Sequence, residues 1–330
     1  MAQQTARSDA QALMPEEVFD EFSERLVTQS AIMQLGRRAP DMNRLQNRVP
    51  VLKTLPISYF KNAGQSHSDT ERKKTSKAEW EDKYLNAEDL VSIIPIPDNV
   101  ADDVDRNIWD SILPYVEESM SQKFDSAVLT GENAPGDWPD DLLSQAAAAN
   151  AAVGLGRDGT DLYDNILSEG GIYNLIEERG YEPTGNVGAI KLRSKLRGLR
   201  DTNNQPIFNR AQPDGQNVQQ GTNYEIDGVP SIFPRNGSVN ANQLLMIAGQ
   251  WDQLVWALRK DVTVDIFRTG VIQDADGNIT YNLLQDDMSA MRVVMRIAWQ
   301  VPNPVNIQET DADVRFPFSV LVPEGGYYYS

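Results

Sequence analysis

The sequence predicts an α+β fold, in which helices and strands are mixed without the regular alternation of a doubly wound sheet. Three observations lead to this prediction: a long extended segment, one long helix with an apolar side, and a series of short strand patterns in the second half. Hydrophobic residues make up 40% of the 330 residues, enough to bury a sizeable core. We therefore expect one elaborated domain or two interlocked domains.

The extended segment begins at 48–60, where apolar and polar residues alternate and Pro50 and Pro56 exclude a central strand. Residues 61–77 hold no side chain more apolar than alanine, so this stretch cannot fold back into a core. Apolar residues return over 80–94 and are expected to lead back to the body. The whole predicts a long two-stranded flap with a polar, basic tip, which a partner surface would stabilise better than water.

The long helix is predicted over 105–130, because apolar residues recur there every four positions: Ile108, Ile112, Val116, Met120, Phe124 and Val128. At 1.5 Å per residue, this helix would be roughly 35–40 Å long. Pro114 is expected to kink it or to mark a joint, and Gly131 is expected to end it. A flexible arm over 1–14 and a helix over 15–35 precede the flap.

Shorter elements fill the rest of the chain. Helices are predicted over 142–153, 162–179 and 192–199, and strands over 186–190, 224–233, 243–248, 254–258, 262–268 and 279–284. Asp276-Gly277 marks a hairpin turn between the last two of these strands. Residues 288–301 fit a helix or a strand, and the proline-punctuated residues after 304 are expected to form a tail.

The composition excludes several kinds of protein. The chain has no cysteines, which removes disulfides, thiolate metal sites and any cysteine nucleophile. No apolar run approaches the roughly 20 residues of a membrane span, and the polar N-terminus lacks the apolar core of a signal peptide. These features favour assembly in the cytoplasm.

The net charge is −18 and is unevenly distributed. Residues 36–83 hold eleven basic and six acidic side chains, residues 84–185 hold four and twenty-one, and residues 186–200 hold five and none. An acidic body with basic segments suits subunits that dock head to side, although any one segment is explained equally well as solvated surface. The acidic total argues against sequence-specific DNA binding.

Two motifs resemble ligand sites but are better explained as turns. Residues 154–159 match G-x-G-x-x-G, yet the alanine-rich segment before them predicts a helix where a nucleotide site needs a strand. Asp274, Asp276 and Asn278 resemble a calcium loop, but Gly277 falls at the fourth position, whereas an EF-hand needs glycine at the sixth. We expect a glycine-rich turn and a hairpin turn at these places.

No catalytic constellation emerges from the remaining residues. His67 is the only histidine and lies in the polar flap tip, so a multi-histidine metal site is excluded. Adjacent acids such as Glu117/Glu118 and Asp140/Asp141 do acid–base chemistry only in a dry pocket that shifts their pKa values. We expect no enzyme activity, no cofactor and no metal, with a hydrolase that uses paired carboxylates as the alternative from another class.

The order of these parts resembles the major capsid proteins of tailed bacteriophages with the Hong Kong 97-type fold. The similarity covers about residues 15–304 and depends on a succession of short motifs. These motifs are Phe124-Asp-Ser-Ala-Val-Leu-Thr-Gly131, Gly188-Ala-Ile-Lys-Leu192, Leu199-Arg-Asp-Thr-Asn-Asn-Gln-Pro-Ile207, Ile226-Asp-Gly-Val-Pro230, Ile247-Ala-Gly-Gln-Trp-Asp252 and Met291-Arg-Val-Val-Met-Arg-Ile-Ala-Trp299. The chain departs from the family at Gln250-Trp251, where many relatives have an acid and a phenylalanine.

The resemblance implies an organisation in six parts. These are an N-terminal arm (1–48), an extended loop (49–90), a peripheral domain with a spine helix (91–141), an axial domain (142–248), a return to the peripheral domain (249–304) and a C-terminal tail (305–330). No long N-terminal scaffolding segment is present, so separate scaffolding or an unaided route is expected.

The resemblance also implies a structural function. Pentamers and hexamers would form an icosahedral phage head that encloses double-stranded DNA without sequence-specific binding, assembled in the host cytoplasm and without a membrane. Scaffolding, portal and decoration proteins are the expected partners. The alternatives are an encapsulin-like nanocompartment shell, which holds protein cargo, and a phage tail or decoration component.

Contacts between subunits are expected at the flap tip and at the hairpin turn. The basic tip residues Arg72, Lys73, Lys74 and Lys77 would meet a neighbour's acids such as Asp102, Asp103 and Asp105, at about 0–1 kcal/mol for each exposed pair. By analogy with the family, the turn with Asp274, Asp276 and Asn278 would lie near local threefold contacts. Some relatives cross-link a loop lysine to an asparagine; Lys61 and the tip lysines with Asn278 are conceivable participants, but we do not predict that bond.

Overall fold

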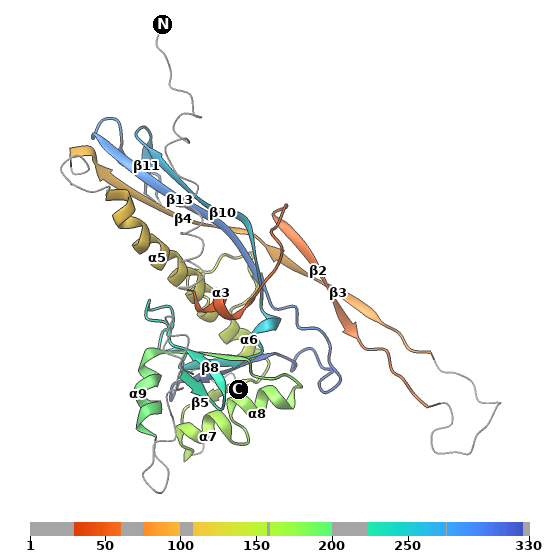
Figure 1. Ribbon diagram of the computed structural model, residues 1–330. Helices are drawn as coiled ribbons and strands as arrows, with labels where there is room; N and C mark the ends of the chain where they lie inside the picture. The colour runs from red at the N-terminus through yellow and green to blue at the C-terminus, as the bar shows by residue number, and fades with distance from the viewer. Residues whose placement is uncertain are drawn as a thin grey trace, which may run out of the picture.

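The computed structural model describes residues 30–60, 75–99, 108–156, 159–199, 224–274 and 276–325. Figure 1 shows two layered parts, one above the other, with a two-stranded flap projecting from one side. The upper part is a four-stranded sheet with one long helix against it, and the lower part is a six-stranded sheet with short helices. This mixture confirms the predicted α+β fold. Within the described ranges, no helix has the length and apolar character needed to cross a membrane.

The four-stranded sheet of the upper part has the order β1-β10-β13-β4. Its strands are β1 (Arg37–Arg38), β10 (Val255–Phe267), β13 (Met288–Gln300) and β4 (Glu88–Pro97). One face is apolar and packs against the long helix: Met291, Val293, Met295 and Ile297 of β13 are buried in one core with Phe124 and Val128. The opposite face has no covering helix among the described residues, as is common for antiparallel sheets.

The long helix is α5 (Ile108–Thr130), as predicted over most of its length. It ends at Gly131, whose φ of +70° is a left-handed conformation that glycine adopts without strain. The helix runs through Pro114 without a break, so the expected joint is not found there. A short helix, α3 (Ala31–Leu35), packs beside α5, while the rest of the helix predicted over 15–35 lies outside the described residues.

The six-stranded sheet of the lower part has the order β5-β14-β9-β6-β8-β7. Its strands are β5 (Ala152–Gly154), β14 (Phe318–Val322), β9 (Met246–Gly249), β6 (Gly185–Gly188), β8 (Val229–Ile232) and β7 (Tyr224–Ile226). The helices of this part are α6 (Leu142–Ala148), α7 (Leu162–Leu167), α8 (Ile172–Glu178) and α9 (Ile190–Gly198). Short connections hold the helices close to the sheet, so the lower part has its own apolar core.

The flap consists of strands β2 (Gln46–Thr54) and β3 (Glu79–Asn86), which pair antiparallel as predicted. Pro50 lies opposite Asp82, and a two-stranded sheet leaves a free edge where a missing N–H costs no ladder bond. Only Ala87 separates β3 from β4, so the flap continues directly into the four-stranded sheet. A second hairpin, β11 (Val271–Gln273) with β12 (Ile279–Asn282), confirms the Asp276-Gly277 turn.

The prediction of a tail over 305–330 is wrong for its central part. Strand β14 lies inside the six-stranded sheet, parallel to β5 and antiparallel to β9, and all five of its residues are buried. Pro317 and Pro323 bracket this apolar run, which made the region resemble a loop. Because its partners lie 70 or more residues away in the sequence, no local pattern indicates the pairing.

Several other predicted bounds are also wrong. The helix predicted over 142–153 ends at Ala148, and Val153 lies in strand β5. Gly170-Gly171 divide the helix predicted over 162–179, because Gly170 has a φ of +77°. The strands predicted over 254–258 and 262–268 form the single strand β10, the segment 224–233 is the hairpin of β7 and β8, and residues 288–300 form a strand. The strand before the Asp276-Gly277 turn is β11, not 262–268.

Candidate assembly surfaces

The flap exposes large apolar side chains. Phe60 is 87% exposed and Trp80 67% exposed, and Ile57 and Tyr84 are also open to solvent. Within the described strands of the flap, only Val51 and Leu85 are buried apolar residues. The expectation that Trp80 returns toward the body is therefore wrong in this subunit. A two-stranded sheet with so little burial is marginal by itself, and exposed aromatic groups of this kind mark interaction surfaces.

The root of the flap, in contrast, is held firmly by the body. Asn86 donates through Nδ2 to the Asp137 carbonyl at 2.7 Å, and its own carbonyl accepts from the Trp138 indole at 3.1 Å. On the other side of the root, the Val305 amide donates to the Leu52 carbonyl at 3.0 Å. The exposed part of the flap is thus presented from a fixed base.

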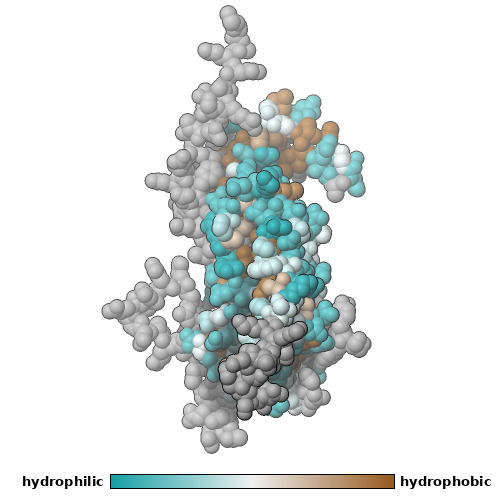
Figure 2. Space-filling model, turned by 90° about the vertical axis from the view of Figure 1, so that its right-hand side faces the viewer, coloured by the Kyte–Doolittle hydropathy of each residue, from teal (hydrophilic) through white to brown (hydrophobic). Residues whose placement is uncertain are grey.

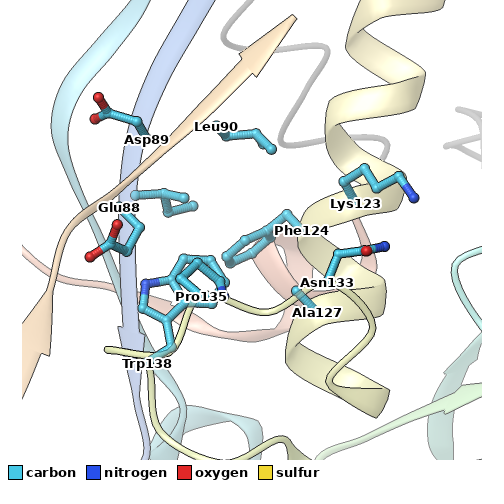
Figure 3. Close-up of a pocket in the computed structure, with 10 residues that line it drawn as sticks. Glu88, Asp89, Leu90, Lys123, Phe124, Ala127, Asn133, Pro135 and Trp138 are labelled. Carbon is cyan, nitrogen blue, oxygen red and sulfur yellow. The ribbon is translucent and has the colours of Figure 1, made fainter. Parts of the chain in front are cut away.

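A cavity of about 150 Å³ lies beside this root, between α5 and the four-stranded sheet. Figure 3 shows Phe124 of α5 and Trp138 of the following loop facing it, whereas the carboxylates of Glu88 and Asp89 and the ammonium of Lys123 point outward. Phe124 and Trp138 meet edge to face, with ring centroids 6.0 Å apart. The lining is therefore mainly apolar, and the acids at its rim do not converge on one point as an acid–base pair would.

Asp125 is a buried carboxylate that fixes the entry of the N-terminal segment. It accepts hydrogen bonds from the Ser30 hydroxyl at 2.5 Å and from the Ala31 amide at 2.9 Å, so it caps the start of α3. Burial raises the pKa of Asp125 to about 7, and the hydrogen bonds from Ser30, Ala31 and Ile32 oppose this shift. Sequence analysis missed this role, although an aspartate inside the apolar run that starts at Phe124 is a visible signal.

The uncovered face of the four-stranded sheet combines apolar side chains with ion pairs. Val91 and Ile93 are exposed on β4, where they lie opposite Val294 and Arg292 of β13. Arg292 pairs with Asp265 at 2.9 Å. Figure 2 shows hydrophobic side chains gathered at the upper end of the molecule, which is the part that contains this sheet.

The second hairpin also exposes apolar groups, including Ile279 and Leu284. Its turn is ordered by Asp274, whose carboxylate accepts from the amides of Asp276 at 3.0 Å and Asn278 at 2.8 Å. These hydrogen bonds lower the pKa of Asp274 below its usual range. The structure thus brings Asp274, Asp276 and Asn278 together in a tight turn, and the carboxylate is committed to backbone amides.

The other predicted contact residues are only partly described. Lys77 pairs with Glu79 of its own flap, so its charge is already partly compensated within the subunit. The remaining candidates lie outside the described residues: Lys61, Arg72, Lys73, Lys74, Asp102, Asp103 and Asp105. The division into six parts with the bounds given above stays a prediction.

The glycine motif at 154–159 needs a correction. Strand β5 precedes it, and helix α7 begins at Leu162, so the helix that we expected before the motif is not there. The Asp161 side chain makes no capping bond at the start of α7. The two cavities found in the described part of the chain are lined by other residues, and neither touches Gly154, Gly156 or Gly159. A turn between strand and helix is the observed structure.

These features define a class of protein. A subunit with an apolar flap on a fixed root, an uncovered sheet face and an exposed apolar hairpin is built to be completed by neighbours, so it is a self-assembling structural protein. Comparisons with known proteins identify the class further. Residues 10–308 match the model of the phage capsid family, and the chain belongs to this family. It is a structural protein of a phage capsid and a component of the virion.

Relatives with known structures share the whole architecture. A chain from Microbacterium phage Oxtober96 is 27% identical with a TM-score of 0.74, and the match covers 98% of this chain and all of that one. A chain from Mycobacterium phage Bobi is 25% identical with a TM-score of 0.73, covering 98% and 96%. The major capsid protein of Klebsiella oxytoca phage phiKO2 is 24% identical over 303 residues, which are 89% of this chain and 66% of that relative.

Proposed function

We propose that this capsid protein is the major subunit of a phage head, forming pentamers and hexamers that close into an icosahedral shell around double-stranded DNA. The observation that carries the proposal is the flap, which exposes Phe60 and Trp80 although its root is hydrogen-bonded to the body. Apolar groups on a projecting arm gain stability only when another subunit buries them, at roughly 25 cal/mol per Å² of apolar surface. The similarity to a major capsid protein supports the same assignment.

In this shell the flap of one subunit lies across the region of α5 in its neighbour. Its basic tip residues Arg72, Lys73, Lys74 and Lys77 face acids such as Asp102, Asp103 and Asp105 of that neighbour. Many repeated contacts supply the stability of the shell, since each exposed ion pair contributes little. The hairpin of β11 and β12 lies near local threefold contacts.

The protein acts without catalysis, cofactor or metal, and it encloses DNA without reading its sequence. Its apolar cavity beside Trp138 does not bring acids together, which supports a structural role over a hydrolase with paired carboxylates. Assembly takes place in the host cytoplasm, with scaffolding, portal and decoration proteins as partners.

Electron microscopy of the expressed chain, with and without neighbouring phage genes, tests this proposal. Deleting residues 61–77 should abolish shells and leave a folded subunit, because only contacts with neighbours are removed. A matched control keeps the length of the flap and replaces 61–77 with a glycine–serine linker of equal size. Intact shells from the deletion would sink the flap mechanism, and small monodisperse particles from the wild type under every condition would overturn the function itself.

A nuclease-protection assay on the shells separates the phage head from the nanocompartment alternative. A head assembled with its packaging partners should protect double-stranded DNA. Shells that contain protein cargo and no protected DNA would support the encapsulin-like alternative.

A further inference from the structure

Helix α9 has an exposed basic face that no described residue neutralises. Leu192 and Leu196 are buried against the six-stranded sheet, and Lys191, Lys195 and Arg197 lie on the exposed side. Among the described residues, none of the ion pairs includes these three cations. Ile190, at the start of the helix, is 49% exposed beside them.

The stability of α9 does not explain this arrangement. Cations in the last turn, such as Lys195 and Arg197, interact favourably with the helix dipole. Lys191, however, lies in the first turn, where a cation is unfavourable and no acid accompanies it. A basic face that extends over both ends of the helix therefore points to a negatively charged surface outside the subunit.

An acidic patch lies on the other side of the same lower part. Its members come from the end of α8 and from a distant loop, and all are exposed: Glu177, Glu178, Glu182, Asp311 and Asp313. The Asn306 side chain donates to the Arg179 carbonyl at 2.7 Å and so joins the loop to α8. Ile307, 88% exposed, lies in this loop.

The basic face and the acidic patch lie at opposite ends of one strand. Glu182 precedes β6 and α9 follows it, so the chain crosses the sheet between the two surfaces. Figure 1 shows α9 at one edge of the lower part and the end of α8, with the loop after β13, at the other. Two complementary surfaces on opposite sides of a subunit fit a heterologous, head-to-tail contact, which closes into rings.

We infer that the α9 face of one subunit binds the acidic patch of the next subunit around the pentamer and hexamer axes. This inference rests on the proposed shell function and names the surfaces within each ring. Ile190 and Ile307 provide an apolar contact in each surface, and the surrounding charges fix the register and steer association. DNA phosphate is the competing occupant of the basic face, and the experiment below distinguishes it.

Charge reversal tests the pairing. Reversing the basic face (Lys191→Glu, Lys195→Glu and Arg197→Glu) should abolish rings and shells, and so should reversing the patch (Glu177→Lys, Glu178→Lys and Glu182→Lys). A chain that carries both reversals should assemble again. The matched control (Lys191→Arg, Lys195→Arg and Arg197→Lys) keeps the charge and should assemble like the wild type. Thermal unfolding of each free subunit shows whether it is folded.

Mixing the two reversed chains provides a sharper test. Complementary contacts form only when the two chains alternate, so hexamers and open sheets should appear without closed shells, because a five-membered ring cannot alternate completely. Normal shells from the basic-face reversal would overturn the inference. It would also be overturned if the double reversal failed to assemble, or if only DNA retention changed, which would assign the face to DNA. If the wild type forms no shells at all, the proposed function fails first.

Discussion

The flap and the core around α5 are neighbours in the chain but are stabilised in different ways. Trp299, in the core, is fully buried and meets Trp138 edge to face at 6.4 Å, whereas Trp80, in the flap, is 67% exposed. The core buries its aromatic groups within one subunit. The flap instead leaves its aromatic groups for another subunit to cover. One chain thus carries a region that folds alone and a region that is completed by assembly, and substitutions separate the two.

The largest effect is expected from Trp299→Ala, which removes a fully buried side chain from the core. The free energy of unfolding of the free subunit should fall by about 3–5 kcal/mol, because a large cavity replaces the indole. Chemical denaturation followed by tryptophan fluorescence or circular dichroism measures it. A loss below about 1 kcal/mol would contradict the assignment of Trp299 to the core.

A smaller, pH-dependent effect is expected at Asp125, which connects α3 to α5. The pKa of this carboxyl is about 7 in the folded chain, well above the value of 3.8 for an ordinary aspartate, so folding favours the protonated form. Its contribution to stability is therefore fully present below about pH 4 and is lost as the pH rises through about 7, by a total of roughly a few kcal/mol.

Asp125→Asn should remove this pH dependence. The difference in unfolding free energy between wild type and variant, measured from pH 4 to pH 8, should change steadily over that window. Asp161→Asn is a suitable control, because that exposed side chain makes no capping bond. Parallel stability curves for wild type and Asp125→Asn would show that the carboxyl is already ionised at low pH, against this account.

Asp274→Ala should have a modest effect on the second hairpin. The variant loses the side-chain bonds to the amides of Asp276 and Asn278, so the turn is less ordered. We expect a loss of about 1 kcal/mol or less in the unfolding free energy, with faster amide exchange over 271–282. A loss of several kcal/mol would mean that the hairpin belongs to the core.

The smallest effect on the free subunit is expected from Trp80→Ala. Unfolding free energy should change by no more than about 0.5 kcal/mol, because most of the indole is already in water. Shell yield should nevertheless fall sharply, since the neighbour loses a buried aromatic anchor. Unchanged assembly together with unchanged stability would show that Trp80 is an ordinary surface residue.

Sequence patterns predicted the features that depend on nearby residues. The four-residue periodicity located α5, alternation and Pro50 indicated a two-stranded flap, and Asp276-Gly277 marked a turn. Features that depend on distant residues were missed. Strand β14 pairs with a strand 70 residues away, and Asp125 caps a helix 94 residues before it. Local periodicity contains no information about such partners.

The same limit applies to the assembly surfaces. The excess of acids over 84–185 and the basic run over 186–200 are visible in the sequence, and both were recognised. Their positions on opposite sides of the lower part depend on β6, and the contribution of Asp311 and Asp313 depends on a side-chain bond from Asn306. Charge patterning thus predicted the kind of contact, and the fold was required to identify its surfaces.

Amide hydrogen exchange of the flap, compared between the free subunit and the assembled shell, tests the central claim most directly. We predict that amides of 46–54 and 79–86 exchange at least about tenfold more slowly in the shell, because two strands with little burial open easily until a neighbour covers them. Amides of 116–129 in α5 should be strongly protected in both states, as an internal reference. Equal exchange of the flap in subunit and shell would contradict the claim that assembly completes it.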